Sequence, residues 1–313
     1  MSWLLRRWSQ GRTFARLMAC SSNEQPSEGV SRVGPGAPGV LATASGPAIE
    51  GPLMIRLVRE LYQYRGLLIS LVQRELKARY RGSFLGFLWT FLNPTLHMLV
   101  YVLLFTVVMR QNIPNFPFFM FVGLLPWIWF STSVGGGASA ISDRRDLLTK
   151  VRFPAQVLPT SVVVTNLCNF VLSLPLMLVL GMAYGQWPTW HVVLFPVVVL
   201  IQLTFTLALT YILAAINVTF RDLQHIVSNL LTLWFFATPV LYPLSTIQDE
   251  SARSLMLALN PMVSLMTSYQ AIFYEHRLPD AEPLMALAAV SVVLLWAASS
   301  IFESRREEFA ESI

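Results

Sequence analysis

The chain has 313 residues, of which 55% are hydrophobic and only 12% are charged, and its formal net charge is +5. Soluble domains carry roughly 25% charged residues, so this deficit excludes an ordinary soluble fold and predicts an all-α protein with several membrane spans. The only two cysteines, Cys20 and Cys168, are far apart and suggest neither a disulfide framework nor a metal site.

Residues 1–50 differ in composition from the rest of the chain. Residues 27–52 are rich in Gly, Pro, Ser and Ala, which bury too little apolar surface to become ordered. Arg6, Arg7, Arg12 and Arg16 interrupt any apolar core that a secretory signal would need. We therefore expect a disordered polar N-terminal tail over residues 1–50.

Residues 53–79 are expected to form an amphipathic helix that lies at the membrane interface. Apolar residues recur there at steps of three and four, the period of a helix face. Basic residues on the other faces suit a helix that lies on an anionic membrane surface. The apolar stripe consists of Met54, Leu57, Leu61, Tyr64, Leu68, Val72 and Leu76.

Long uncharged runs follow, and each can hold spans of about 20 apolar residues. We predict six spans, near 86–109, 117–138, 157–182, 191–216, 226–243 and 283–302. The further apolar run 254–274 is interrupted by Asn260-Pro261, and proline disrupts helix interiors. That run is therefore expected to form two short re-entrant helices on the outer side, between the fifth and sixth spans.

The distribution of basic residues sets the expected orientation. With both termini in the cytoplasm, only Arg110, Arg253 and Arg277 of the chain after residue 52 fall outside, as the positive-inside rule favours. The domain 51–305 would then end in a short cytoplasmic tail, 306–313.

No Asp, Glu, Lys or Arg lies centrally in a predicted span, which argues against proton-driven transport. His97 is the one titratable group at depth, and we interpret it as a hydrogen-bonded packing residue. No phosphate-binding loop of the form GxxxxGK[ST] occurs, so energy for uphill transport would come from another chain. The chain itself is not expected to be an enzyme.

The predicted cytoplasmic connections concentrate charge. The segment Asp143–Pro154 interleaves charged side chains with Leu147, Leu148, Val151 and Phe153. A solvated loop would explain its basic residues, whereas an amphipathic helix that docks onto another protein would explain the apolar ones as well. The second connection holds the adjacent pair Arg221-Asp222.

These segments resemble, in order and spacing over residues 53–305, the permease subunits of ABC-2 type exporters of the polysaccharide branch, which carries O-antigen, capsule or teichoic acid chains. One departure is Ser268-Tyr-Gln270, where the family commonly has Tyr-Arg. The matching stretches are Leu71–Gly86, Leu88–Pro94, Phe121–Trp127, Lys150–Pro154 with Leu158-Pro159, Phe220–Asp222, Thr238–Pro243 and Leu259–Pro261.

The resemblance implies a half-transporter that moves a lipid-linked polysaccharide across the cytoplasmic membrane. Its partners would be a second copy of itself, membrane lipids and two ABC ATP-binding subunits, with no nucleic acid. No cofactor is expected on this chain, because ATP and Mg would bind to the partner subunit. The broken helices over 245–275 would gate the exit.

The resemblance also implies roles for three groups of residues. The first group would couple the chain to the ATPase: Asp143, Arg144, Arg145, Asp146, Lys150, Arg152, Phe153, Pro154, Arg221 and Asp222. The second lies at the membrane interface where substrate would be admitted: Arg74, Lys77, Arg79, Tyr80, Arg81 and Gly82. The third is a candidate substrate path of aromatic residues, which an interfacial aromatic belt would explain equally: Trp89, Trp127, Trp129, Tyr242, Tyr269, Phe273 and Tyr274.

Two alternatives stay open at this stage. The chain could be an ABC-2 permease for a drug or a lipid. Less favoured is a membrane-embedded glycosyl- or acyltransferase, for which Asp222 and His225 would be the only candidate pair, and Arg221 is the more plausible partner of Asp222.

Overall fold

The computed structural model describes residues 53–80, 86–110, 113–150 and 153–305, all of which belong to one compact unit. Every regular element in these ranges is a helix, which confirms the predicted all-α class. The predicted tails 1–50 and 306–313 lie outside the described residues.

The predicted interfacial helix is two helices, α3 (Leu53–Gln63) and α4 (Arg65–Tyr80). Much of its apolar stripe packs against other parts of the protein, while its place at the membrane interface stays a prediction. Leu57 packs with residues of α9 and α13, and Val72 is likewise buried. The sequence pattern was correct, but the helices that follow provide the surface that covers the stripe.

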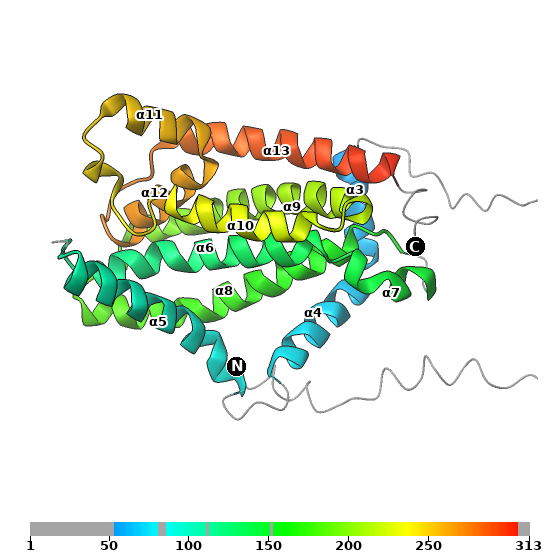
Figure 1. Cartoon of the computed structure of the whole chain (residues 1–313), viewed down its shortest axis with the longest axis horizontal. Coiled ribbons are helices and arrows are strands. Elements are labelled where there is room, and N and C mark those ends of the chain that lie inside the picture. Colours follow the sequence, from blue (N-terminus) through cyan, green and yellow to red (C-terminus); the bar gives the residue numbers. More distant parts are fainter. Residues whose placement is uncertain (1–52, 81–85, 111–112, 151–152, 306–313) are drawn as a thin grey trace, which may run out of the picture. The chain divides into compact units, whose positions relative to one another are not determined.

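Five helical segments are long and apolar enough to cross a membrane, and they match five of the six predicted spans to within a few residues (Figure 1). Short turns of other helix types adjoin two of these segments: η2 (Gly86–Leu88) precedes the first, π-helical η3 (Leu103–Val108) ends it, and 3₁₀ η5 (Trp190–Leu194) opens the fourth. The main helices are α5 (Trp89–Val102), α6 (Phe116–Ala138), α8 (Val157–Ala183), α9 (Phe195–Thr219) and α13 (Ala281–Ser304).

The sixth predicted span is represented by a shorter apolar helix, α10 (Leu223–Phe236), which ends well before the predicted residue 243. Pro239 and Pro243 supply no N–H for a continued helix, which explains the early end. The carbonyls left over are capped by side chains: Asn260 Nδ2 donates to Ala237 O at 3.0 Å, and Gln270 Nε2 donates to Pro239 O at 2.8 Å. Gln270 is the position at which the sequence departs from the family pattern.

The predicted break at Asn260-Pro261 is present. After η6 (Leu244–Thr246), helix α11 (Glu250–Leu259) ends at Asn260, where α12 (Pro261–Phe273) begins. Asn260 Oδ1 accepts the Met262 amide at 3.0 Å as an N-cap and also accepts Trp234 Nε1 of α10 at 2.8 Å. One side chain therefore ties the end of α10 to the start of α12.

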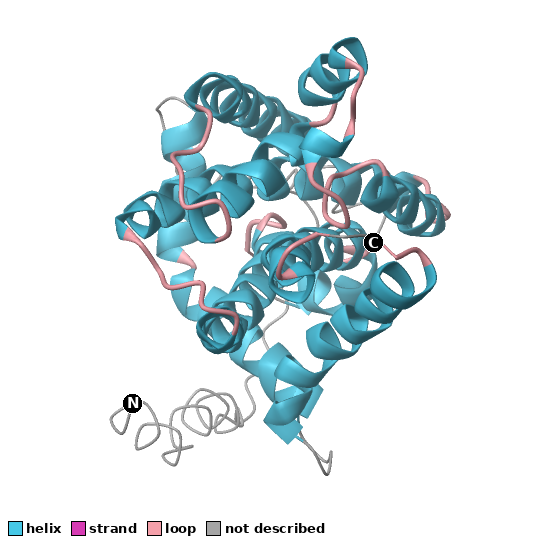
Figure 2. Ribbon diagram, turned by 90° about the vertical axis from the view of Figure 1, so that its left-hand side faces the viewer, coloured by secondary structure: helices cyan, strands magenta, loops and turns pink. Residues whose placement is uncertain are grey.

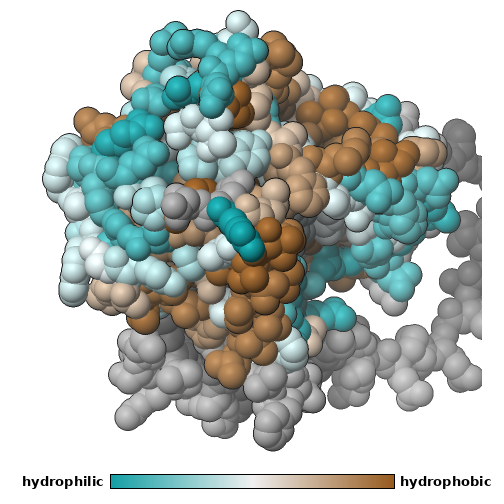
Figure 3. All heavy atoms as spheres, turned by 60° about the vertical axis from the view of Figure 1, so that its left-hand side comes forward, coloured by the Kyte–Doolittle hydropathy of each residue, from teal (hydrophilic) through white to brown (hydrophobic). Residues whose placement is uncertain are grey.

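Helix α6 forms the centre of the bundle, with α5, α8, α9, α10 and α12 packed against it, while α13 lies along α9. Figure 2 shows the helices nearly end on, with loops joining them at the end nearest the viewer. Most of α6 is buried, whereas α5 exposes a row of large apolar side chains, and broad apolar areas lie beside hydrophilic ones on the face drawn in Figure 3. Large exposed apolar areas are expected of a protein whose surroundings are lipid.

Candidate functional site

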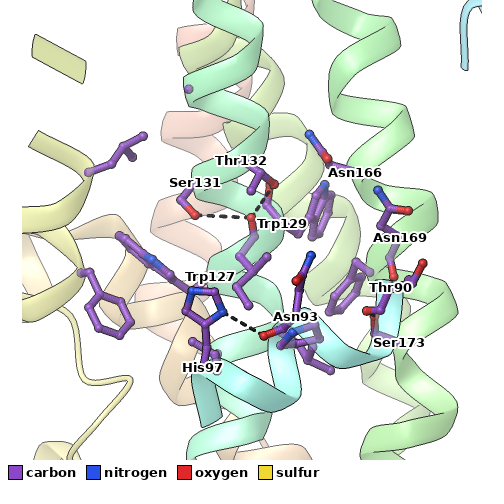
Figure 4. Close-up of a pocket in the computed structure, with 18 of the residues that line it drawn as sticks. Thr90, Asn93, His97, Trp127, Trp129, Ser131, Thr132, Asn166, Asn169 and Ser173 are labelled. Carbon is purple, nitrogen blue, oxygen red and sulfur yellow. Dashed lines mark hydrogen bonds between the residues drawn. The ribbon is translucent and has the colours of Figure 1, made fainter. Parts of the chain in front are cut away.

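An open cleft of about 810 Å³ lies between α5, α6, α8 and α10, and Arg79 from the last turn of α4 borders it (Figure 4). The volume is within the usual range of ligand sites, roughly 300–1,000 Å³. The cleft exists because α5 packs only loosely against α6 and α8, and of its own residues only Thr90 and Pro94 are buried.

Uncharged polar side chains from three helices face the cleft. His97 Nδ1 lies 2.9 Å from Asn93 O on α5, Thr132 Oγ1 donates to Ile128 O at 2.6 Å on α6, and Thr232 Oγ1 donates to Ser228 O at 3.1 Å on α10. Each group is thus satisfied by its own helix, while the hydroxyl oxygens keep lone pairs that can accept from a ligand. Amide groups of Asn166 and Asn169 on α8 complete this lining.

Aromatic rings form the apolar part of the lining. The Trp127 ring lies 5.6 Å from Phe130 and 5.5 Å from Phe235, while Trp129 stacks on Phe170 at 5.2 Å with 19° between the planes. Trp127 is 5% exposed and Trp129 only 1% exposed, so both belong to the floor of the cleft. Trp89, which is half-buried, presents the more accessible indole.

The other four predicted path residues do not line this cleft. Tyr269 is buried in the bundle and donates to Gln202 Oε1 at 2.7 Å. The Phe273 ring packs edge-on against Phe195 at 5.3 Å. Tyr242 and Tyr274 belong to loops near α11 and α12, where their hydroxyls donate to Phe236 O at 3.4 Å and Pro114 O at 2.7 Å.

The Tyr274 hydroxyl remains a donor over the physiological range. Burial, and secondly the negative charge of Glu275, raise the pKa of Tyr274. A raised phenol pKa keeps the proton on the oxygen, so the hydrogen bond to Pro114 O persists. This tyrosine holds two connecting segments together, whatever else it contacts.

The predicted coupling segment forms a 3₁₀ turn, η4 (Ser142–Arg144), and the short helix α7 (Arg145–Lys150). Asp143 and Asp146 are exposed, whereas Leu147, Leu148 and Phe153 pack against the buried Leu71 and Leu158. Three of the four apolar side chains that suggested a docking face are therefore used within the chain, and the fourth, Val151, lies outside the described residues. Arg152 lies outside the described residues, as does the environment of the Lys150 side chain.

One residue of this segment is linked to α4. Arg144 Nη2 lies 2.7 Å from Glu75 Oε2, an ion pair that joins the turn before α7 to the second of the two N-terminal helices. The sequence interpretation missed Glu75, because a single carboxylate among basic residues gives no signal of its partner. A further contact, Asn217 Nδ2 to Ser142 Oγ at 3.3 Å, joins the same turn to α9.

The remaining predicted site residues are dispersed. Arg221 and Asp222 are both exposed between α9 and α10, and no ion pair involving either of them is present within the described ranges. Arg74 and Lys77 are exposed on α4, and Arg79 is the one membrane-interface residue found at the cleft. Arg81 and Gly82 lie outside the described residues, as does the Tyr80 side chain.

Several cleft residues were missed by sequence reasoning. His97, interpreted as a packing residue, is exposed to the cleft, and Asn93, Asn166 and Asn169 were not singled out. A usable signal was present, since polar side chains within apolar spans are costly and tend to face the interior or a watery cavity. An inventory of amides, in addition to charges, would have identified them.

Comparison with known proteins identifies the family. The chain is 32% identical to the O-antigen export system permease protein RfbA of Klebsiella pneumoniae over 249 residues, which are 78% of this chain and 94% of the relative. It is 24% identical to the polysialic acid transport protein KpsM of Escherichia coli over 254 residues, 78% of this chain and 95% of that protein. Residues 66–274 match the ABC-2 type transporter family, and the chain therefore belongs to that family.

Proposed function

We propose that this chain is the transmembrane permease subunit of an ATP-driven exporter that moves a lipid-linked polysaccharide across the cytoplasmic membrane. Two copies would form the translocation unit, and two ABC ATP-binding subunits would supply the energy. Helix α7 would lie on the cytoplasmic side and α11 on the outer side, with α10 as a short sixth span.

The cleft is the observation that carries the proposal. It combines the indole of Trp89 with amides and hydroxyls such as Asn93 and Thr132, none of which is ionised. Flat aromatic faces suit the C–H faces of sugar rings, and neutral hydroxyls and amides exchange hydrogen bonds with sugar hydroxyls. Such contacts are individually weak, which suits a polymer that must slide and not stay bound.

The names of the relatives support a polysaccharide substrate but do not decide its charge, since one is named for O-antigen export and the other, 24% identical, for transport of polysialic acid, a polymer with a carboxylate on every residue. The described part of the chain contains no group of His, Cys, Asp and Glu that could hold a metal ion. Asp222 and His225, the pair considered for a transferase, are exposed at the start of α10 and do not line the cleft, so no observation favours that alternative.

A blocking substitution in the cleft tests the proposal. Thr132→Trp would fill the cleft, whereas Thr204→Trp on α9 changes a threonine with the same i−4 hydrogen bond (Oγ1 to Leu200 O, 2.8 Å) that does not line it. Both variants would be produced with the ATP-binding partner in cells that lack another exporter, and polysaccharide on intact cells would be measured.

We expect Thr132→Trp to lose surface polysaccharide at normal membrane levels of protein, and Thr204→Trp to keep it. Normal export by Thr132→Trp would contradict the assignment of this cleft as the substrate path.

The ATPase contact is tested separately. Replacing Arg145 and Lys150 by Glu should abolish export and co-purification of the ATP-binding subunit while the protein stays inserted. The α7 segment would then be the docking element, because reversing its charge leaves unpaired charges in the interface. Full export by this double variant would show that α7 is not the element that docks the ATP-binding subunit.

A further inference from the structure

We infer that the polymer admitted by this cleft is an uncharged glycan, and that chains with a carboxylate on every repeat are excluded. The inference rests on the proposed function and narrows its substrate class. The inference is based on the charges of the residues along the proposed path. Both copies of the chain have the same sequence, so each would contribute the same charges to that path.

The cleft itself provides almost no charge. Among the described residues that line it, Arg79 alone carries an ionised side chain, and it belongs to α4 and not to a membrane-crossing helix. The exposed polar groups along the wall are amides, hydroxyls and an imidazole, exemplified by Asn93, Ser228 and His97.

The same holds for every other surface that could border a path through the membrane. No Asp, Glu, Lys or Arg occurs within Trp89–Met109, Phe116–Ala138, Val157–Ala183, Trp190–Thr219, Leu223–Phe236 or Pro261–Phe273. In α13 the only such residues, Glu282 and Glu303, lie at its two ends. A pore wall built from any of these helices, in one copy or two, is therefore uncharged over its length.

An uncharged wall discriminates against a polyanion. Pores that conduct anions offer rings of Lys or Arg to replace lost hydration, and this chain offers none at depth. A carboxylate in the cleft would be partly desolvated, with no opposite charge to offset that loss. A charged lipid anchor meets this barrier once per polymer, and Arg79 at the border of the cleft is a cation that could pair with it, whereas a polyuronate meets the barrier at every repeat.

The test compares two polymers on one anchor. Cells that lack their own exporter would produce this chain with its ATP-binding partner, and would synthesise on the same lipid diphosphate either a neutral hexose homopolymer or a hexuronate homopolymer of similar length. Surface polymer would be measured on intact cells and total polymer after lysis.

We expect the neutral polymer at the surface and the hexuronate polymer retained, with at least about a tenfold lower surface fraction, the factor equivalent to 1.4 kcal/mol. Equal surface fractions for the two polymers would overturn the inference while leaving the proposed function intact. Retention of both polymers would instead refute the proposed function.

A substituted cleft gives an independent measurement. Ser228 is exposed in the cleft wall, and Ser228→Lys and Ser228→Gln add side chains of similar length that differ in charge. At matched membrane levels, the ratio of hexuronate to hexose export should rise several-fold in the Lys variant relative to the Gln variant. An identical ratio in the two variants would count against charge as the basis of selection.

Discussion

The close approach of α6 and α9 at Gly137 predicts a specific stability defect. A Cβ atom added at Gly137 on α6 would lie 2.1 Å from Thr210 Cγ2 on α9, where ordinary van der Waals contact requires at least 3.4 Å. Thr210 is itself fully buried, so its methyl group has nowhere to move. Gly137→Ala must therefore push α6 and α9 apart or force Thr210 out of its rotamer.

The expected cost follows from two opposing effects. Overpacking of a close-packed core costs roughly 1–3 kcal/mol, while replacing glycine by alanine within a helix stabilises by up to about 1 kcal/mol. For so short an approach we expect the upper end, a net loss of about 2 kcal/mol. At this chain length that corresponds to a fall in melting temperature of roughly 3 °C.

Two further variants isolate the contact. Thr210→Ser removes Cγ2 and should restore most of the stability of Gly137→Ala, because the remaining Thr210 atoms lie 3.4 Å or more from the new Cβ. Gly135→Ala, two residues away on the same helix, meets only Leu231 Cδ1 at 3.7 Å and should be neutral or slightly stabilising.

The assay is thermal unfolding of the purified protein in one detergent, followed by tryptophan fluorescence for the unsubstituted chain and the three variants. If Gly137→Ala melts like the Gly135→Ala control, or if Thr210→Ser does not rescue it, the close approach of α6 and α9 is not as described and the packing argument fails.

Three further predictions concern the connections between helices. Charge reversal of either Arg144 or Glu75 should lower ATP-dependent export, and the exchanged pair Arg144→Glu with Glu75→Arg should recover most of it; an exchanged pair no better than the single reversals would show that the contact is unimportant. Asn260→Ala should lower the free energy of unfolding by about 1–3 kcal/mol, because it strips hydrogen bonds from the ends of two helices, whereas Asn260→Asp keeps both acceptor roles and should lose less in the same melting assay. Single cysteines at Asp280 and Ser312 in an otherwise cysteine-free chain should react with an impermeant thiol reagent on intact cells at Asp280 only; labelling at Ser312 would contradict the six-span topology.

The sequence predicted the elements of this fold well where the physical cause is local. Uncharged runs gave five spans because lipid demands about 20 apolar residues, and the split at residue 260 followed from Pro261, which cannot continue a helix. The amphipathic stripe from Met54 to Leu76 was also recognised, as a pattern.

The partners of the stripe could not be predicted, because the periodicity of apolar residues shows that one helix face is buried but does not show which part of the protein covers it. Leu57 packs with residues of α9 and α13. These helices are far from Leu57 in the sequence, so no local sequence pattern indicates the contact. The ion pair of Arg144 with Glu75, 69 residues apart, was missed for the same reason. The cleft was found only in part, since Trp89 could be proposed from its chemistry but Tyr269 could not be excluded until its burial was known.

The early end of α10 has a mechanical consequence. Its 14 residues extend about 21 Å, less than the roughly 30 Å of a bilayer core, so the segment from Ala237 to Pro243 forms the rest of that wall without a helix. A continuous helix changes shape only by breaking its own hydrogen-bond ladder. This wall is instead fastened through two amide side chains, those of Asn260 and Gln270, which are both tied to α12. If this segment borders the proposed path, a displacement of α12 can reshape that border by exchanging a few side-chain hydrogen bonds, with every helix left intact.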